Sequence, residues 1–97
     1  MKFDWNIDKA ETNIYKHGVS FEEASTVFYD ENAIVFDDPD HSDEKEERFN
    51  IIGFSDSARL LIVCHCVRGE DEVIRIISAR IATKRESKQY EKITGRW

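Results

Sequence analysis

The residues best suited to chemistry in this chain are basic, and they are gathered in its last quarter. Seven cations lie there against two anions, Glu86 and Glu91; the cations are Arg75, Arg80, Lys84, Arg85, Lys88, Lys92 and Arg96. Residues 1–58 carry five cations and fifteen anions, and the whole chain has a formal net charge of −6. A separated basic cluster in an acidic chain indicates a local site for a polyanion such as RNA. The same pattern also fits a solvated helix face or a surface for an acidic protein partner.

The segment around Arg80 carries groups that bind phosphate. Arg80 ends an apolar run typical of a strand, and Thr83 followed by Glu86 has the spacing of a capping box that starts a helix. An arginine fork donates two hydrogen bonds to phosphate oxygens, and a helix N-terminus adds backbone N–H groups and a positive dipole end. We therefore expect an anion site here, formed by Arg80, Thr83, Lys84 and Arg85. The alternative is that Arg80 pairs with one of the chain's many carboxylates.

The two cysteines do not have the spacing of a metal site. Cys64 and Cys66 flank His65 in the apolar run 60–67. Alternate side chains of a strand share a face, so the cysteines point one way and His65 the other. A structural zinc site needs four ligands in familiar spacings, which are absent, and the acidic loop 37–47 lacks the glycine and glutamate positions of a calcium loop. We predict buried thiols in a core strand, with no metal and no cofactor.

Length and composition predict one globular domain spanning residues 1–97. The chain is 40% hydrophobic and 35% charged, with one proline and four glycines. No apolar run approaches the ~20 residues of a membrane span, and the N-terminus has no signal-peptide core. We expect a protein of the cytoplasm that does not enter a membrane.

The hydrophobic pattern predicts an α+β domain with a mostly antiparallel sheet. Strands are expected at 3–5, 33–36, 48–54, 59–67 and 73–80, and helices from Asp8 to Gly18, from Ser20 to about residue 29, and from Thr83 to about Ile93. The order is therefore β-α-α-β-β-β-β-α, with the first two helices covering one face of the sheet. Ala10 and Ile14 should point inward from the first helix, whereas the last helix is basic and has a thin apolar face.

Strict alternation along the last strand separates its two arginines. It places Ile74, Ile76, Ser78 and Arg80 on one face, and Val73, Arg75, Ile77 and Ala79 on the other. An arginine that leaves the sheet just before a basic helix is well placed to meet phosphate.

Several segments, in order along nearly the whole chain, resemble the BrnT toxins of bacterial type II toxin–antitoxin systems. They are Phe3-Asp4-Trp5, the run from Lys16 to Ala24 (KHGVSFEEA), the run from Asp38 to Ser42, Glu47-Arg48-Phe49 with Ile52-Gly53, and the run from Arg75 to Glu86. The KHGVSFEEA and ISAR blocks are specific to that family. This chain departs from the family at one point: family members often have an aromatic residue near His65, where this chain has Cys64-His65-Cys66.

The resemblance implies a compact fold like that of the RelE toxins and an endoribonuclease that cleaves mRNA and arrests translation. It also implies neutralisation by a BrnA-type antitoxin, a heterotetramer of toxin and antitoxin, and binding of operator DNA only through that complex. Two early acidic helices and one lone basic helix argue against a DNA-binding repressor acting by itself.

Metal-independent RNA cleavage uses the 2′-OH of the substrate as the nucleophile, so the protein must move protons and stabilise phosphorane charge. We expect Arg80 to be the charge clamp, assisted by Lys84 or Arg85, and His17 to be the acid or base. His17 also fits a helix-capping role before Gly18. His65 and Glu86 are second-rank candidates. The residues expected to hold RNA are Arg75, Thr83, Lys88 and Tyr90, although Tyr90 equally fits core packing.

The alternative to an enzyme is a non-catalytic partner-binding module. Its basic C-terminal patch would dock an acidic or amphipathic segment of another protein, and the same arginines would then serve recognition.

Overall fold

A computed structural model describes residues 1–42 and 46–95. These residues form the helices α1 (Ile7–His17), α2 (Phe21–Thr26) and α3 (Lys84–Thr94), the strands β1 (Phe3–Asp4), β2 (Ile34–Asp37), β3 (Phe49–Phe54), β4 (Leu60–Arg68) and β5 (Val73–Ile81), and the 3₁₀ turns η1 (Val27–Tyr29) and η2 (Pro39–His41). Every element predicted from the sequence is present within a few residues. None of the helices in this part of the chain is both long and apolar enough to cross a membrane.

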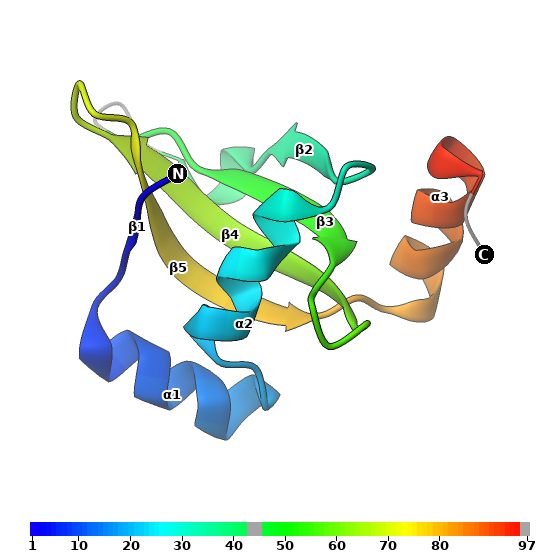
Figure 1. The fold of residues 1–97 in the computed structure, drawn as a ribbon, viewed down its shortest axis with the longest axis horizontal. Helices are drawn as coiled ribbons and strands as arrows, with labels where there is room; N and C mark the ends of the chain where they lie inside the picture. The colour runs from blue at the N-terminus through cyan, green and yellow to red at the C-terminus, as the bar shows by residue number, and fades with distance from the viewer. Residues whose placement is uncertain (43–45, 96–97) are drawn as a thin grey trace.

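The strands form one sheet in the order β1-β5-β4-β3-β2. Strands β2 to β5 are antiparallel neighbours, because short turns join β3 to β4 and β4 to β5, whereas β1 pairs in parallel with β5 at Ile74 and Arg75. Helices α1 and α2 lie together, and α3 stands apart from them at the end of the sheet where β5 ends (Figure 1). The predicted α+β class with a mostly antiparallel sheet is confirmed.

Local capping chemistry sets the helix boundaries. Asn6, and not the predicted Asp8, caps α1, because its side chain accepts a hydrogen bond from the backbone N–H of Lys9 at 3.1 Å. Gly18 ends α1 in the left-handed conformation, with φ 67°. The predicted capping box of α3 is complete, since Thr83 and Glu86 bond each other's backbone N–H groups.

The main core lies between the sheet and the first two helices. Its buried members are Val19, Phe21, Ala24, Val27, Ile51, Leu61, Val63, Ile76 and Ala79. Ala10 packs against this core as predicted. The prediction that Ile14 points inward is wrong, because 50% of this residue is exposed.

Asn13 takes the inward position on α1, because this helix lies along the edge of β5. The Asn13 amide donates to the backbone oxygens of Ala79 (2.8 Å) and Val19 (2.9 Å) and accepts from the N–H of Ala79 at 3.0 Å. Its side chain therefore supplies the hydrogen bonds that a neighbouring strand would give beyond the short β1.

A bulge in β5 changes which residues share a face. Cys64 of β4 pairs with Ser78, but the next residue, His65, pairs with Ile76, so Ile77 is an extra residue. The predicted alternation is therefore wrong across this point. Ile76 and Ala79 are both buried in the main core, and Arg75 joins Ser78 and Arg80 on the opposite face.

A second, smaller core covers part of that opposite face. It consists of Ile52, Ile62 and Tyr90, with Ile34, Phe54, Leu60 and Ala82 packed against it. The hydroxyl of Tyr90 donates to Asp30 Oδ2 at 2.9 Å. This ring anchors α3 to the sheet.

Candidate functional site

The face of the sheet opposite α1 and α2 contains a polar hollow of about 400 Å³. Its lining residues are Asp38, Arg48, Asn50, Ile62, Cys64, Ile77, Ser78 and Arg80. Asn50, Cys64 and Ser78 are direct partners across β3, β4 and β5. The floor is thus a row of small polar side chains, and arginines from two different strand ends lie at its walls.

Arg80 is held in place by Glu86. Its NH1 and NH2 groups donate to the two carboxylate oxygens of Glu86 at 2.8 and 2.9 Å. This pairing raises the pKa of Arg80 and holds the pKa of the Glu86 carboxyl at about 2. A guanidinium has five N–H donors, so donors remain for a ligand, and 43% of the Arg80 side chain is exposed. The carboxylate pairing considered as the alternative for Arg80 is therefore present, and it orients the fork beside the hollow.

Arg48 was not among the site residues predicted from the sequence. Its Nε donates to Glu46 Oε1 at 3.1 Å, and its side chain is 29% exposed. The sequence does indicate that Arg48 and Asn50 share a face, because they are two residues apart in a strand. It does not indicate that Arg48 lies in the same hollow as Arg80, since this depends on the pairing of β3, β4 and β5.

Cys64 and His65 are both buried, and they point to opposite faces of the sheet. Burial, followed by the charge of Asp38, raises the pKa of the Cys64 thiol to about 11, and its Sγ lies 3.6 Å from Asp38 Oδ2. His65 points to the other face of the sheet, where its ring meets Phe28 with centroids 4.8 Å apart. Burial lowers the pKa of His65, which is therefore a neutral core residue near pH 7.

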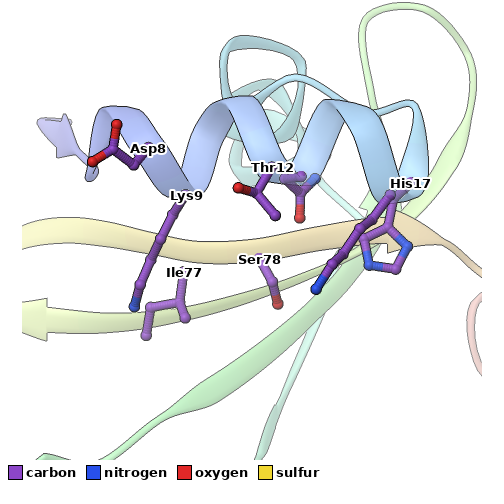
Figure 2. A pocket seen from close by; sticks show the side chains of 8 residues that line it. Asp8, Lys9, Thr12, His17, Ile77 and Ser78 are labelled. Carbon is purple, nitrogen blue, oxygen red and sulfur yellow. The ribbon is translucent and has the colours of Figure 1, made fainter.

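His17 lines a different hollow, of about 290 Å³, between α1 and β5 (Figure 2). Its lining residues are Asp8, Lys9, Thr12, Asn13, Lys16, His17, Ile77 and Ser78. Lys9 and His17 extend from α1 across β5, towards the side of Ile77 and Ser78 (Figure 2). His17 and Arg80 thus lie in neighbouring hollows that share Ile77 and Ser78, and His17 is also a basic residue in the last turn of α1, as its capping role requires.

The predicted cations of α3 lie on its outer side. Lys84, Arg85 and Lys88 are exposed, and with Gln89 and Lys92 they line a shallow surface that does not include Arg80. We call Lys84, Arg85, Lys88 and Lys92 the basic row. No ion pair within residues 1–42 and 46–95 involves the basic row. Arg96, the last cation of the predicted cluster, lies outside the described residues.

The remaining RNA-binding candidates have internal partners. Arg75 donates to Asp4 Oδ1 at 3.2 Å, and Thr83 accepts the capping bond from the Glu86 N–H. Tyr90 is 1% exposed, and its ring contacts Phe54 edge to face. In this arrangement Tyr90 packs in a core and does not offer its ring to a base.

Within the described residues, no three His, Cys, Asp or Glu side chains come together as ligands for a metal ion.

Comparison with known families identifies the relatives of this fold. The model of the family described as "Ribonuclease toxin, BrnT, of type II toxin-antitoxin system" matches residues 5–86. The chain belongs to the BrnT family. The resemblance inferred from its sequence is thereby confirmed.

A solved BrnT structure supports the same assignment. The 1.1 Å crystal structure of the Brucella abortus ribonuclease toxin, BrnT, is 28% identical, with a TM-score of 0.64 over 87% of this chain and 99% of that chain. No curated protein matches. The BrnT family match includes Arg48, Arg80 and Glu86 but ends before Lys88 and Tyr90.

Two of the segments that carry the resemblance to BrnT toxins border the hollows. The KHGVSFEEA block contains His17, the helix end at Gly18 and the cap of α2 at Ser20, whereas the ISAR block contains the bulge at Ile77 and the arginine at position 80. Both segments therefore lie at the irregular geometry beside β5.

Proposed function

We propose that this BrnT-family toxin is an endoribonuclease that cleaves mRNA at the hollow between Arg48 and Arg80 and thereby arrests translation. The observation that carries the proposal is this pair of arginines, set on either side of the polar row Asn50, Cys64 and Ser78. Arginine forks match phosphate oxygens, and a positioned positive charge stabilises the negative charge that develops during phosphoryl transfer.

The nucleophile in this mechanism is the 2′-OH of the substrate. Its oxygen forms a bond to the adjacent phosphorus while the bond to the 5′-oxygen breaks, which leaves a 2′,3′-cyclic phosphate and a 5′-OH. One proton leaves the 2′-OH and one is given to the 5′-oxygen. No metal or cofactor takes part in this mechanism.

Arg80 is the proposed clamp for the phosphorane oxygens, with Arg48 opposite. Glu86 acts as a positioning residue because its two hydrogen bonds fix the plane of the Arg80 guanidinium. Lys84 and Arg85 assist from the start of α3, and the phosphates farther along the RNA are contacted by Arg75, Thr83 and Lys88. Tyr90 contributes by holding α3 in place.

The proposed acid or base is His17. The Cys64 thiol, which lines the hollow between Arg48 and Arg80 and has a pKa of about 11, and Glu86, which is bound to Arg80 and has a pKa of about 2, are too far from neutrality to exchange protons readily. His17 belongs to the adjoining hollow, and an RNA strand lying over Ile77 and Ser78 would contact both hollows.

The proposed physiological partner is a BrnA-type antitoxin that neutralises the toxin in a heterotetramer. Operator DNA would be bound only by this complex, in the cytoplasm. Membership of a type II toxin family supports an antitoxin partner.

The second candidate is a non-catalytic partner module. It is favoured by the separation of the basic row from the hollow between Arg48 and Arg80, since the row alone suffices to dock an acidic segment.

Induced expression in a growing bacterium, followed by primer extension on cellular mRNA, tests the proposal. We expect growth arrest and new 5′-ends for the wild type, and a loss of roughly 10²–10³-fold in cleavage rate for Arg80→Ala. Lys2→Ala is the control, because Lys2 is an exposed cation that lines neither this hollow nor that of His17. Intact mRNA with well-folded wild-type protein would favour the partner module, and full cleavage by His17→Ala would leave that histidine with its capping role.

A further inference from the structure

An apolar groove of about 320 Å³ runs between α3 and the sheet. Its lining residues are Ile34, Phe36, Ile52, Ile62, Glu86, Gln89, Tyr90 and Ile93. Phe36 is 43% exposed and Ile93 is 71% exposed. Large apolar side chains around a concavity are typical of a binding site for another protein, and they offer little to RNA phosphates.

Buried side chains form the floor of the groove. Ile52, Ile62 and Tyr90 form the second core beneath it, and the hydrogen bond from Tyr90 to Asp30 ties α3 to the loop before β2. On the same helix, Glu86 is bound to Arg80. These contacts hold both walls of the groove, so a ligand meets a surface that is already formed.

The charge beside the groove selects the kind of partner. Gln89 lines both the groove and the surface of the basic row. Residues 1–58 carry fifteen anions and five cations, so an acidic partner is repelled by much of the molecule and attracted by the basic row. A segment with one apolar side and one acidic side satisfies the groove and the basic row together.

We propose that the groove between α3 and β2 binds an amphipathic, acidic segment of the antitoxin. Its apolar side chains insert between Phe36 and Ile93, and its carboxylates pair with Arg85, Lys88 and Lys92. The partner's identity, and the consequence for activity, rest on the proposed function. The bound segment covers cations that RNA would use and lies against Glu86, the residue that orients Arg80, so it neutralises the toxin from beside the hollow.

The test measures binding of the purified full-length toxin to its own antitoxin by isothermal titration calorimetry. We expect Ile93→Asp to weaken the affinity by at least about tenfold, because a carboxylate would enter the groove unpaired. The double charge reversal Lys88→Glu with Lys92→Glu should weaken the affinity similarly and reduce its dependence on salt. Ile14→Asp is the matched control, since Ile14 is an exposed isoleucine of α1, and its affinity should stay within about twofold.

A second measurement separates this proposal from the ribonuclease proposal. In the absence of antitoxin, Ile93→Asp should cleave RNA at the wild-type rate, and added antitoxin should no longer stop it at concentrations that silence the wild type. If the wild type cleaves no RNA but the calorimetry follows the expected order, the ribonuclease proposal fails and the docking site stands.

Two results would overturn the docking site. One is wild-type antitoxin affinity in Ile93→Asp; if that variant fails to fold, Phe36→Ser takes its place with the same expectation. The other is a concentration-dependent dimer of the free toxin that Ile93→Asp abolishes, which would assign the groove to a second copy of the chain.

Discussion

The two faces of the sheet are made by the same strands but carry different side chains. Towards α1 and α2, the central strands present Ile51, Leu61, Val63, Ile76 and Ala79, all buried in one apolar core. Towards the other side they present Asn50, Cys64, Ser78 and Arg80, which line a hollow. Each fully buried valine, leucine or isoleucine side chain of the first face contributes roughly 1.5–3 kcal/mol to stability. The polar face contributes less to folding, so its residues can be selected for binding and charge.

The bulge at Ile77 is what keeps the two faces distinct. Without the extra residue, Ile76 and Arg80 would share a face, so that one of them would be in the wrong environment. We therefore expect substitutions on the face covered by α1 and α2 to reduce stability, and substitutions in the hollow to reduce activity while the fold is retained.

The largest stability loss is expected for Asn13→Leu, at the edge of the covered face. Leucine fills the space but leaves the buried N–H and C=O of Ala79 and the C=O of Val19 without their partner. We expect a loss of about 2–4 kcal/mol in the free energy of unfolding, measured by urea denaturation. Thr12→Val, on the exposed side of the same helix, is the control. Wild-type stability in Asn13→Leu would mean that the amide does not close the edge of β5.

A smaller, pH-dependent effect is expected for Glu86→Gln on the open face. The folded-state pKa of Glu86 lies at about 2, below its ordinary 4.5, so its stabilisation is fully present above pH 4.5 and is lost as the pH falls through 2. Because 43% of the Arg80 side chain is exposed, solvent screening leaves about 1 kcal/mol at pH 7.

The difference in unfolding free energy between wild type and Glu86→Gln should therefore shrink between pH 4.5 and pH 2. Denaturant titrations across that range measure it, with Glu91→Gln on the same helix as the control. A difference that does not change with pH would contradict the ion pair. Slower RNA cleavage by Glu86→Gln at pH 7, with its stability nearly retained, would sharpen the contrast between the two faces.

The smallest effect is expected for Ile14→Ser. Ile14 lies on α1, beside the covered face, yet half of this residue is exposed. We expect a change within about 0.5 kcal/mol by thermal or urea unfolding. A loss of 2 kcal/mol or more in the free energy of unfolding, as expected for a buried isoleucine, would mean that Ile14 is part of the core and would contradict the inward position of Asn13.

The fold was largely predictable because its signals are local. Gly18 ends α1, the Thr83 and Glu86 capping box starts α3, and the apolar runs with short turns between them predict antiparallel strands. One prediction failed within the local sequence, since Asn6 and not Asp8 caps α1. Another failed where a long-range contact overrode a local rule: Asn13 took the place of Ile14 because the adjacent surface is a strand edge and not an apolar face.

The candidate site was predictable only in part. The concentration of positive charge, the choice of Arg80 as a candidate and the family of the chain follow from residue types and their spacing along the sequence. The tertiary structure alone decided that Arg48 shares the hollow with Arg80, that His65 and Tyr90 are core residues, and that His17 lies in an adjoining hollow. These outcomes depend on the register between strands and on one extra residue at Ile77, which are fixed by packing between segments far apart in the chain.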